Sequence, residues 1–308
     1  MEELILHYFL RITSLFIVVI LIYFSHLFFI KEIKFTNNNL TIIKNQSTQN
    51  IINENIVNLN YIEKFFIQKY LSIYSKFFKK IYFGKFIISE KKNINNLIST
   101  ITKPSNFILK ITIVEGWSKK QLNTILESNF ENYKSIEYND ILSDTYYLHS
   151  YENFDDFYLK LKNFKNNIEI KFKEHELLKY FSFKELMIIG SLLEKEGKDD
   201  NDKKVIFSII KNRLRKNMKL QIDATTIYAI TDGRYDLNRD LRYKDLKVEH
   251  PYNTYYIKGL PPEPISYVGK KTMEIIFENY KSKFFYYFYN NIVKKHIYSE
   301  TFEEHKRK

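Results

Sequence analysis

A glutamate near the middle of the sequence combines two features that suit a general acid. The string FKELMIIGSLLEKE begins directly after Ser182, and Glu185 lies three residues further on. This spacing is a capping box, which predicts that a helix begins at this point. At 100° per residue, Ile189, Leu193 and Glu196 lie on one face of that helix. Glu196 therefore continues an apolar stripe at the helix C-terminus.

Burial and the negative end of the helix dipole both disfavour the ionised form of Glu196 and raise its pKa. A carboxyl group that stays protonated near neutral pH is what general acid catalysis requires. The alternative is that Glu196 is a solvated residue at a helix end. Glu194 points about 160° away on the same helix and lines a cleft rim at most. We expect Gly197 to end the helix in a left-handed conformation.

Two further segments carry residues that suit substrate binding. Asp199, Asp200 and Asp202 predict the start of a second helix, and Arg213 and Arg215 lie at its basic end. The two arginines stand out because the whole chain has only seven. The strings LQIDATTIY and HPYNTYYIKGLPPEP follow, and the second holds four of the five prolines. This second string is expected to be a rigid loop.

The composition restricts the kinds of chemistry that these residues can perform. The chain has 308 residues, a net charge of +12 and no cysteine. The lack of cysteine excludes disulfides, Cys-ligated metal sites and a thiol nucleophile. Neither a P-loop nor a dinucleotide fingerprint occurs, so the sequence offers no nucleotide-binding motif. Lysine, asparagine and isoleucine are abundant as in proteins of AT-rich genomes, so the basic charge by itself is weak evidence of a binding function.

The elements around these motifs begin with a membrane-spanning segment. Ile12 to Ile30 is a run of 19 residues without a formal charge, which is nearly the length needed to cross a bilayer core of about 30 Å. A buried core helix and a cleaved signal peptide are the alternatives to a retained anchor, which we favour. The few charges that flank the run do not decide its orientation.

Two folded parts follow the anchor, and together they predict an α+β fold. Residues 35–105 form a small α+β unit, with helical spacing over 51–81, a strand in YFGKFIIS and a short helix over 93–100. Residues 106–308 form a larger mixed unit. It contains a strand over 107–114, a helix from Ser118 and further helical segments over 154–161 and 174–180.

Four ordered strings carry a resemblance to a known family. EGWS, SLLEKEG, IKNRLRKNMKLQIDATTIY and PYNTYYIKGLPPEPI resemble the endolytic murein transglycosylases of the YceG-like family. The resemblance covers roughly residues 111–305, and the C-terminal FFYYFYNNIVKKHIYSETFEEH resembles the closing hairpin and helix of the family. The N-terminal part resembles it more weakly. The resemblance implies three parts: residues 1–34 would be a cytoplasmic tip and membrane anchor, residues 35–105 a LysM-like subdomain and residues 106–308 the catalytic domain.

The resemblance also implies a function. The protein would be a single-pass protein of the cell (inner) membrane whose catalytic domain faces the cell wall. It would cleave the β-1,4 bond between N-acetylmuramic acid and N-acetylglucosamine within peptidoglycan strands, leave 1,6-anhydro ends and work beside peptidoglycan synthases. Glu196 matches the family's catalytic glutamate. The implied reaction needs no cofactor and no metal, which agrees with the absence of a cysteine cluster and of nucleotide-binding motifs. The implied substrate-binding residues are Glu194, Arg213, Gln221, Asp223, Tyr228, Tyr252, Asn253, Thr254 and Tyr255.

The sequence departs from the family at several positions, and other functions stay open. Ala224 replaces a proline, Gly197 replaces a threonine, and the terminal hairpin turn is shortened to Asn290–Asn291. Each implied binding residue could instead support the scaffold. One alternative function is a membrane-anchored peptidoglycan-binding scaffold without catalysis. Another is a nucleic-acid or anionic-lipid binder, which the absence of a nucleic-acid motif disfavours.

Overall fold

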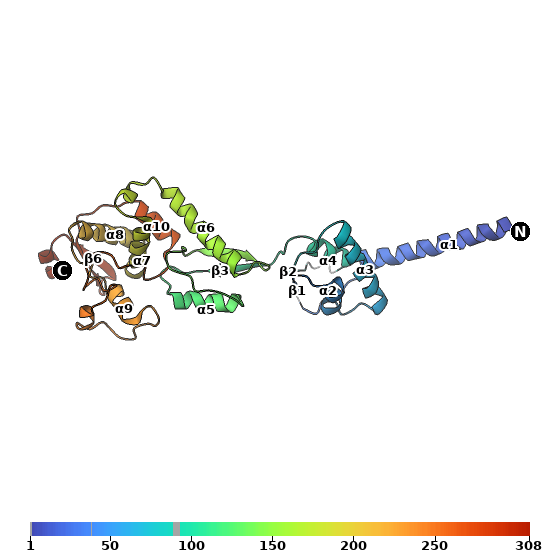
Figure 1. Ribbon diagram of the computed structural model, residues 1–308, viewed down its shortest axis with the longest axis horizontal. Coiled ribbons are helices and arrows are strands. Elements are labelled where there is room, and N and C mark those ends of the chain that lie inside the picture. The colour runs from blue at the N-terminus through green and yellow to red at the C-terminus, as the bar shows by residue number, and fades with distance from the viewer. Residues whose placement is uncertain (1, 38, 89–92) are drawn as a thin grey trace. The chain divides into compact units, whose positions relative to one another are not determined.

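The computed structural model describes residues 2–37, 39–88 and 93–308 (Figure 1). The chain forms two compact units. The first contains Met1–Leu109 and Tyr147–Glu152, and the second contains Lys110–Tyr146 and Asn153–Lys308. Ser89, the last residue of the expected strand YFGKFIIS, lies outside the described residues. The sequence boundary at residue 105 stays a prediction.

The first unit is a small α+β fold on a long N-terminal helix. Its elements are α1 (Glu2–Ser25), η1 (His26–Ile30), β1 (Asn39–Ile42), α2 (Thr48–Asn55), α3 (Tyr61–Phe77), β2 (Gly84–Ile87) and α4 (Ile94–Ile101). The strands are antiparallel, with Leu40 opposite Phe86. Both side chains join a buried cluster with Ile52, Ile67 and Leu71 from the helices. This unit therefore has a core of its own.

From Leu6 onward, helix α1 is exposed along nearly its whole length. Leu6–Ile30 is long and apolar enough to cross a membrane, and only 6% of its most apolar stretch is buried. That exposure excludes the core-helix alternative. The predicted apolar run at 12–30 is thus confirmed as part of one continuous helical segment, α1 and η1.

The side of helix α3 that packs on the core of the first unit is not the side that the sequence suggested. The expected helix over 51–81 is two helices, because residues 56–60 separate α2 from α3. The residues that α3 buries are Glu63, Ile67 and Leu71. The spacing that predicted a helix here runs through Ile62 and Phe66, which are 61% and 39% exposed. The helical prediction is confirmed, but this apolar stripe lies outside the core.

The second unit holds the motifs that the sequence analysis singled out. Its elements, with the two strands that link the units, are β3 (Ile108–Thr112), α5 (Lys119–Asn129), β4 (Thr145–His149), α6 (Phe154–Phe172), η2 (Glu176–Lys179), α7 (Phe183–Glu196), α8 (Asp200–Arg215), α9 (Asp223–Thr231), η3 (Asp245–Lys247), α10 (Lys270–Phe277), β5 (Tyr286–Asn290), β6 (Lys295–Ser299) and α11 (Phe302–Arg307). β3 pairs with β4, and β5 pairs with β6. The predicted closing hairpin and helix are confirmed.

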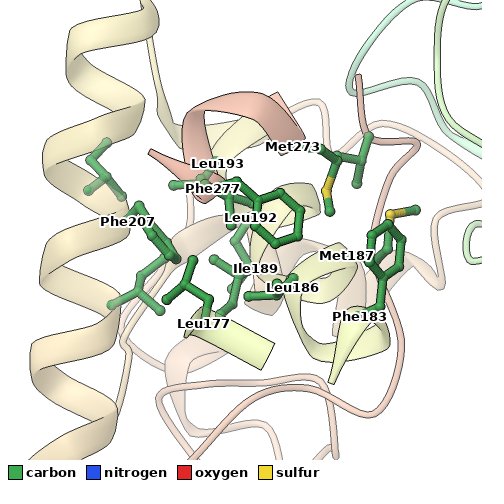
Figure 2. Close-up of a cluster of buried hydrophobic side chains, with 14 of the residues drawn as sticks. Leu177, Phe183, Leu186, Met187, Ile189, Leu192, Leu193, Phe207, Met273 and Phe277 are labelled. Atoms are coloured by element: carbon green, nitrogen blue, oxygen red, sulfur yellow. The ribbon is translucent and has the colours of Figure 1, made fainter. Parts of the chain in front are cut away.

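Helix α7 is the centre of this unit and packs against α8 and α10 (Figure 2). Leu186, Ile189 and Leu193 are fully buried and meet Phe207 of α8 and Phe277 of α10. Burial of each such side chain contributes about 1.5–3 kcal/mol relative to exposure. The predicted stripe of Ile189 and Leu193 is buried, but so is every other residue from 186 to 193, so α7 is surrounded by the core on all sides.

A close approach at Gly190 brings the segment 265–269 onto α7. A Cβ atom at Gly190 would lie 2.7 Å from Cγ1 of Val268, so this position requires glycine. The hydroxyl of Ser191 accepts a hydrogen bond from the backbone N–H of Ile265 at 3.0 Å. The proline-rich loop before Ile265 is thus anchored to α7.

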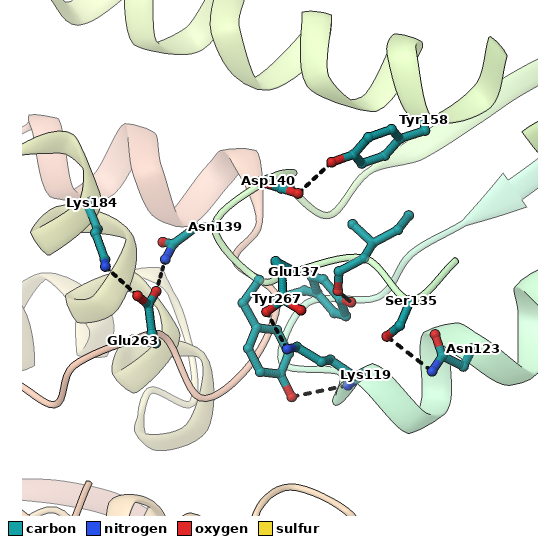
Figure 3. A network of polar contacts seen from close by, with 12 residues as sticks. Lys119, Asn123, Ser135, Glu137, Asn139, Asp140, Tyr158, Lys184, Glu263 and Tyr267 are labelled. Carbon is teal, nitrogen blue, oxygen red and sulfur yellow. Dashed lines mark hydrogen bonds and ion pairs between the residues drawn. The ribbon is translucent and has the colours of Figure 1, made fainter. Parts of the chain in front are cut away.

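Polar contacts tie the segment 135–140 to its surroundings (Figure 3). Tyr158 of α6 donates a hydrogen bond to Asp140 at 2.5 Å, and Tyr267 donates to the carbonyl of Ile136 at 2.6 Å. Glu263 accepts hydrogen bonds from both Asn139 and Lys184. These contacts link α6, the proline-rich loop and the first turn of α7.

Candidate active site

Helix α7 ends at the residue with the predicted chemistry. Ser182 and Glu185 form the predicted capping box, which confirms the expected helix start. Gly197 does not take the expected left-handed conformation, because its φ is −73° and its backbone is extended. A Cβ atom at Gly197 would lie 2.3 Å from Cγ of Lys203 and 3.1 Å from the carbonyl oxygen of Leu193, so a larger residue here would require Lys203 to move. The sharp exit of the chain leaves Glu196 at the very end of the helix.

Glu196 lines a cavity of about 450 Å³, which is within the usual size of small-ligand sites. The cavity is lined by the ends of several elements rather than by one of them. Its lining residues are Glu196, Arg213, Gln221, Asp223, Tyr255, Tyr286, Tyr287, Phe288, Tyr289, His296, Phe302 and His305. Five residues predicted from sequence therefore meet here: Glu196, Arg213, Gln221, Asp223 and Tyr255.

The surroundings of Glu196 favour its protonated form. Burial raises the pKa of this carboxyl group, and the nearby charge of Asp223 raises it further. A hydrogen bond from Tyr287 at 3.1 Å, the charge of His296 and the backbone N–H of Ala224 act in the opposite direction. Burial dominates, so the pKa of Glu196 is raised above its ordinary value.

A second carboxylate of the cavity is held by a tyrosine. Tyr255 donates a hydrogen bond to Oδ1 of Asp223 at 2.7 Å, and Asp223 itself is exposed. Asp223 begins helix α9, where the helix dipole favours a negative charge. The two carboxyl groups thus differ in environment: Glu196 is half-buried, and Asp223 faces solvent.

The turn before α9 carries backbone strain. Gln221 has a φ of +54°, a conformation that costs a side chain other than glycine or asparagine about 1–3 kcal/mol. Its backbone N–H donates to the carbonyl of Thr254, and the N–H of Ile222 donates to the hydroxyl of Thr254. These bonds hold the strained turn and place the side chain of Gln221 at the cavity.

Arg213 ties two walls of the cavity together. Its Nε donates to the carbonyl of Phe285 at 2.6 Å, and its Nη1 donates to the carbonyl of Leu220 at 2.8 Å. Its guanidinium carbon lies 5.2 Å from the ring centre of Tyr286. Arg213 is only 6% exposed. Its contacts are thus mainly with the protein's own backbone.

The hairpin supplies cavity residues that the sequence analysis missed. His296 lies 2.7 Å from Oδ2 of Asp202 on α8, and both side chains are less than a tenth exposed. Tyr298 also donates a hydrogen bond to Asp202. Because Tyr287 pairs with Tyr298 and Tyr289 pairs with His296, these four residues share one face of the hairpin. The sequence offered no alternation to mark this face, because residues 284–289 are all aromatic.

The structure keeps Glu194 apart from the cavity. Its side chain is 2% exposed and forms an ion pair with Lys203 at 2.5 Å. Its other oxygen accepts a hydrogen bond from the N–H of Gly269 at 2.8 Å. Glu194 therefore joins α7 to α8 and to the start of α10, and it does not lie with the predicted binding residues.

The YNTY segment, residues 252–255, contains two buried residues between two partly exposed tyrosines. Asn253 and Thr254 are fully buried. Asn253 accepts a hydrogen bond from Thr226 and donates to two loop carbonyls, so it shapes the loop. Tyr252 packs on Tyr228 with ring centres 4.7 Å apart. Tyr228 lines two further cavities of about 540 and 470 Å³ between α5 and the end of α9.

Comparisons with known proteins agree with this architecture. The family model of the YceG-like family matches residues 40–308. The chain is 35% identical over 126 residues to the endolytic murein transglycosylase of Bacillus subtilis (strain 168), which is 41% of this chain and 34% of that protein. It is 32% identical over 132 residues to the endolytic murein transglycosylase of Streptococcus pneumoniae serotype 2 (strain D39 / NCTC 7466), which is 42% of this chain and 24% of that protein. The matched segment thus spans about a third or less of these relatives.

A solved structure shares the fold. The crystal structure of a yceG-like protein from Listeria monocytogenes superposes with a TM-score of 0.51 at 22% sequence identity. The match covers 87% of this chain and 98% of that chain.

Proposed function

The chain belongs to the YceG-like family, and from this premise we propose that it is an endolytic murein transglycosylase. Glu196 is the catalytic acid and then the base. The observation that carries this proposal is the position of Glu196: its carboxyl group lies in a cavity, has a raised pKa and accepts a hydrogen bond from Tyr287. The names of the relatives from Bacillus subtilis and Streptococcus pneumoniae support the same activity.

The first step is proton transfer to the bond that breaks. The protonated carboxyl group of Glu196 gives its proton to the glycosidic oxygen between N-acetylmuramic acid and N-acetylglucosamine. The bond from C1 of the muramic sugar to that oxygen breaks, and N-acetylglucosamine leaves with a free 4-hydroxyl group. Asp223 supports this step because its negative charge raises the pKa of Glu196.

The second step closes a ring within the muramic sugar. The carboxylate of Glu196 takes the proton from the C6 hydroxyl group, whose oxygen bonds to C1. The product has a 1,6-anhydro end, no water is consumed, and Glu196 returns to its protonated form. An ordinary glycosidase instead uses two carboxyl groups and a water molecule. A hydrogen bond from Tyr287 stabilises the carboxylate between the two steps.

The remaining cavity residues bind and shape the substrate site. The amide of Gln221 suits the acetamido and hydroxyl groups of the sugars, and the rings of Tyr255 and Tyr289 offer stacking surfaces. The cavities beside Tyr228 would hold neighbouring sugars of the same strand, as an endolytic enzyme needs. Arg213, Asn253 and Thr254 act mainly by holding the walls in place, which their backbone hydrogen bonds support.

The placement of the protein in the cell is part of the proposal. Leu6–Ile30 would cross the cell membrane once with the N-terminus in the cytoplasm, so that the catalytic domain faces the cell wall. Residues 35–105 would serve as a LysM-like subdomain that positions glycan. Peptidoglycan synthases would be partners, since shortening of new strands requires access to them.

The test is product analysis with the full-length protein in detergent and purified murein. Cleavage should release muropeptides with 1,6-anhydro ends, which mass spectrometry identifies by the loss of one water. Binding to murein without any anhydro product would instead support the inactive scaffold. Products with reducing ends would point to hydrolysis and contradict the one-carboxyl mechanism.

A further inference from the structure

An exposed aromatic face on α3 has no role in the proposed catalysis. The residues that are exposed at helical spacing, here named the aromatic face, are Ile62, Phe65, Phe66, Tyr70, Ile73 and Phe77. They lie within about 140° of one another around the helix axis, opposite the buried Ile67 and Leu71. A continuous apolar surface of this kind marks an interaction site in a folded protein.

The aromatic face is continuous with the membrane-spanning helix. Phe24 of α1 meets Phe66 with ring centres 5.1 Å apart, and Phe28 meets Tyr70 at 4.8 Å. The apolar span ends at Ile30, six residues after Phe24. At 1.5 Å per residue, Phe24 lies about 9 Å from the end of the span. The aromatic face is therefore level with the last turns of the apolar segment, where acyl chains meet headgroups.

Charged groups lie where this placement requires them. Lys31, the first residue after the span, pairs with Glu63 of α3 at 2.5 Å, so this carboxylate is neutralised at the boundary. Residues 61–80 contain five lysines and no other acidic residue. Lys69 lies 5.5 Å from the ring centre of Phe65, and Lys76 lies 5.6 Å from that of Phe77. Cations beside aromatic rings suit anionic headgroups above acyl chains.

We propose that α3 lies in the headgroup region of the bilayer that α1 crosses, with the aromatic face toward the lipid. This inference goes beyond the proposed activity but depends on the proposed anchor. Tyrosine and phenylalanine side chains at this depth, with lysines toward the phosphates, are typical of helices that lie in a membrane interface. The first unit would then be held against the membrane by two helices rather than by a single flexible anchor.

Fluorescence quenching in proteoliposomes tests this placement directly. The chain has no cysteine, so a single introduced cysteine accepts a fluorophore at one chosen position. Full-length Phe65→Cys and Phe77→Cys proteins would be labelled and reconstituted in phosphatidylethanolamine and phosphatidylglycerol with nitroxide-labelled lipid. The nitroxide would be near the headgroup end of the acyl chain. Both labels should lose fluorescence relative to vesicles without nitroxide.

Two reference positions separate the possible outcomes. Val18→Cys on α1 reports the anchor, and Ile87→Cys, which is 51% exposed on β2, reports the far end of the same unit (Figure 1). We expect quenching at Val18 and little at Ile87. If Val18 is quenched but Phe65 and Phe77 respond like Ile87, the inference is wrong and the anchor stands. If Val18 is not quenched either, the anchor fails and the inference fails with it.

A further pair of measurements addresses the nature of the contact. Phe65→Asp and Phe77→Asp together, with the reporter at Ile73→Cys, should reduce the quenching to the Ile87 level, because carboxylates oppose burial in an anionic interface. Energy transfer between labels at Phe77 on two copies, without lipid quenching, would assign the face to a second copy of the chain and overturn the proposal.

Discussion

The hydroxyl group of Tyr287 lies 3.1 Å from Oε2 of Glu196, although the two residues are 91 positions apart in the chain. Glu196 ends the central helix α7, and Tyr287 belongs to the C-terminal hairpin. The C-terminal hairpin thus contacts the carboxyl group at the end of α7. This contact means that the charge state and the orientation of Glu196 depend on the hairpin as well as on α7.

Replacement of Glu196 by glutamine should abolish the formation of anhydro products. Glutamine keeps the shape of the side chain but has no transferable proton, so the rate should fall at least about 100-fold. The measurement is release of anhydro-muropeptides from murein, with binding to sacculi and thermal unfolding followed in parallel. Both of these should stay close to wild type.

The matched control is Glu194→Gln on the same helix. Glu194 is buried against Lys203 and lies outside the cavity. Loss of its charge should lower the free energy of unfolding by about 3 kcal/mol, because Lys203 loses its charged partner. Cleavage by the folded protein should persist. If folded Glu194→Gln protein is inactive and Glu196→Gln protein is active, our assignment is wrong and Glu194 carries the chemistry.

The pH dependence of cleavage should move in opposite directions in two variants. The reaction needs protonated Glu196, so the rate falls as the pH rises through the pKa of Glu196. Asp223→Asn removes a charge that raises this pKa, so the alkaline limb should shift to lower pH. Tyr287→Phe removes a hydrogen bond that lowers it, so the limb should shift to higher pH. Each shift should be about one unit or less.

The control for the pH profiles is Tyr289→Phe, whose ring packs on His296 in the same cavity. Its alkaline limb should coincide with that of the wild type. Shifts in the same direction for the Asp223 and Tyr287 variants would contradict the assignment of Glu196 as the titrating acid.

Asp202→Asn should loosen the hairpin and alter the acid stability of the protein. Burial opposes the charge of Asp202, but hydrogen bonds from His296, Tyr298 and the N–H of Lys198 outweigh it and lower its pKa below 3.8. A depressed pKa contributes stability that is present above pH 3.8 and is lost as the pH falls through the folded-state pKa. Urea unfolding should show a loss of about 1–3 kcal/mol at neutral pH.

The pH dependence of this stability difference shows whether the charge of Asp202 is responsible for it. As the pH falls below 3.8 and through the folded-state pKa of Asp202, the difference between wild type and Asp202→Asn should shrink, since the unfolded wild type takes up its proton first and the folded wild type follows. A difference that stays constant from pH 7 to pH 3 would show that packing, and not the charge of Asp202, is what the substitution removes.

Arg213→Lys should destabilise the fold more than it weakens substrate binding. A lysine ammonium cannot reach the carbonyls of Phe285 and Leu220 together, as the guanidinium does. We expect a loss of about 3 kcal/mol in the free energy of unfolding. Arg215→Lys, at the exposed end of the same helix, should change it by less than about 0.5 kcal/mol. A large rise in KM with unchanged stability would make Arg213 a substrate contact instead.

Protease treatment of intact spheroplasts should digest the protein beyond Lys34. One crossing by Leu6–Ile30 with a cytoplasmic N-terminus leaves all later residues outside the cytoplasm. The N-terminal sequence of the isolated protein should still begin before the apolar run. Full protection of the later residues, or a mature N-terminus after Ile30, would contradict the proposed topology.

The sequence alone was enough to predict the local elements, because their signals are local. The capping box at Ser182 and Glu185 and the apolar run at 12–30 each belong to one short stretch of the chain. The sequence was also enough to single out Glu196, because its alignment with Ile189 and Leu193 and its place at the helix C-terminus both follow from the sequence of one helix. The family strings agreed with that choice.

Only the tertiary structure decided which side chains share the cavity and which support it. Glu194 and Thr254 are in the same strings as cavity residues, yet an ion pair with Lys203 and full burial place them in the scaffold. Tyr287 and His296 come from a distant hairpin, and no local pattern connects them to Glu196. The apolar stripe of α3 predicted a helix but not its exposed side, because a helical period identifies a face without stating what covers it.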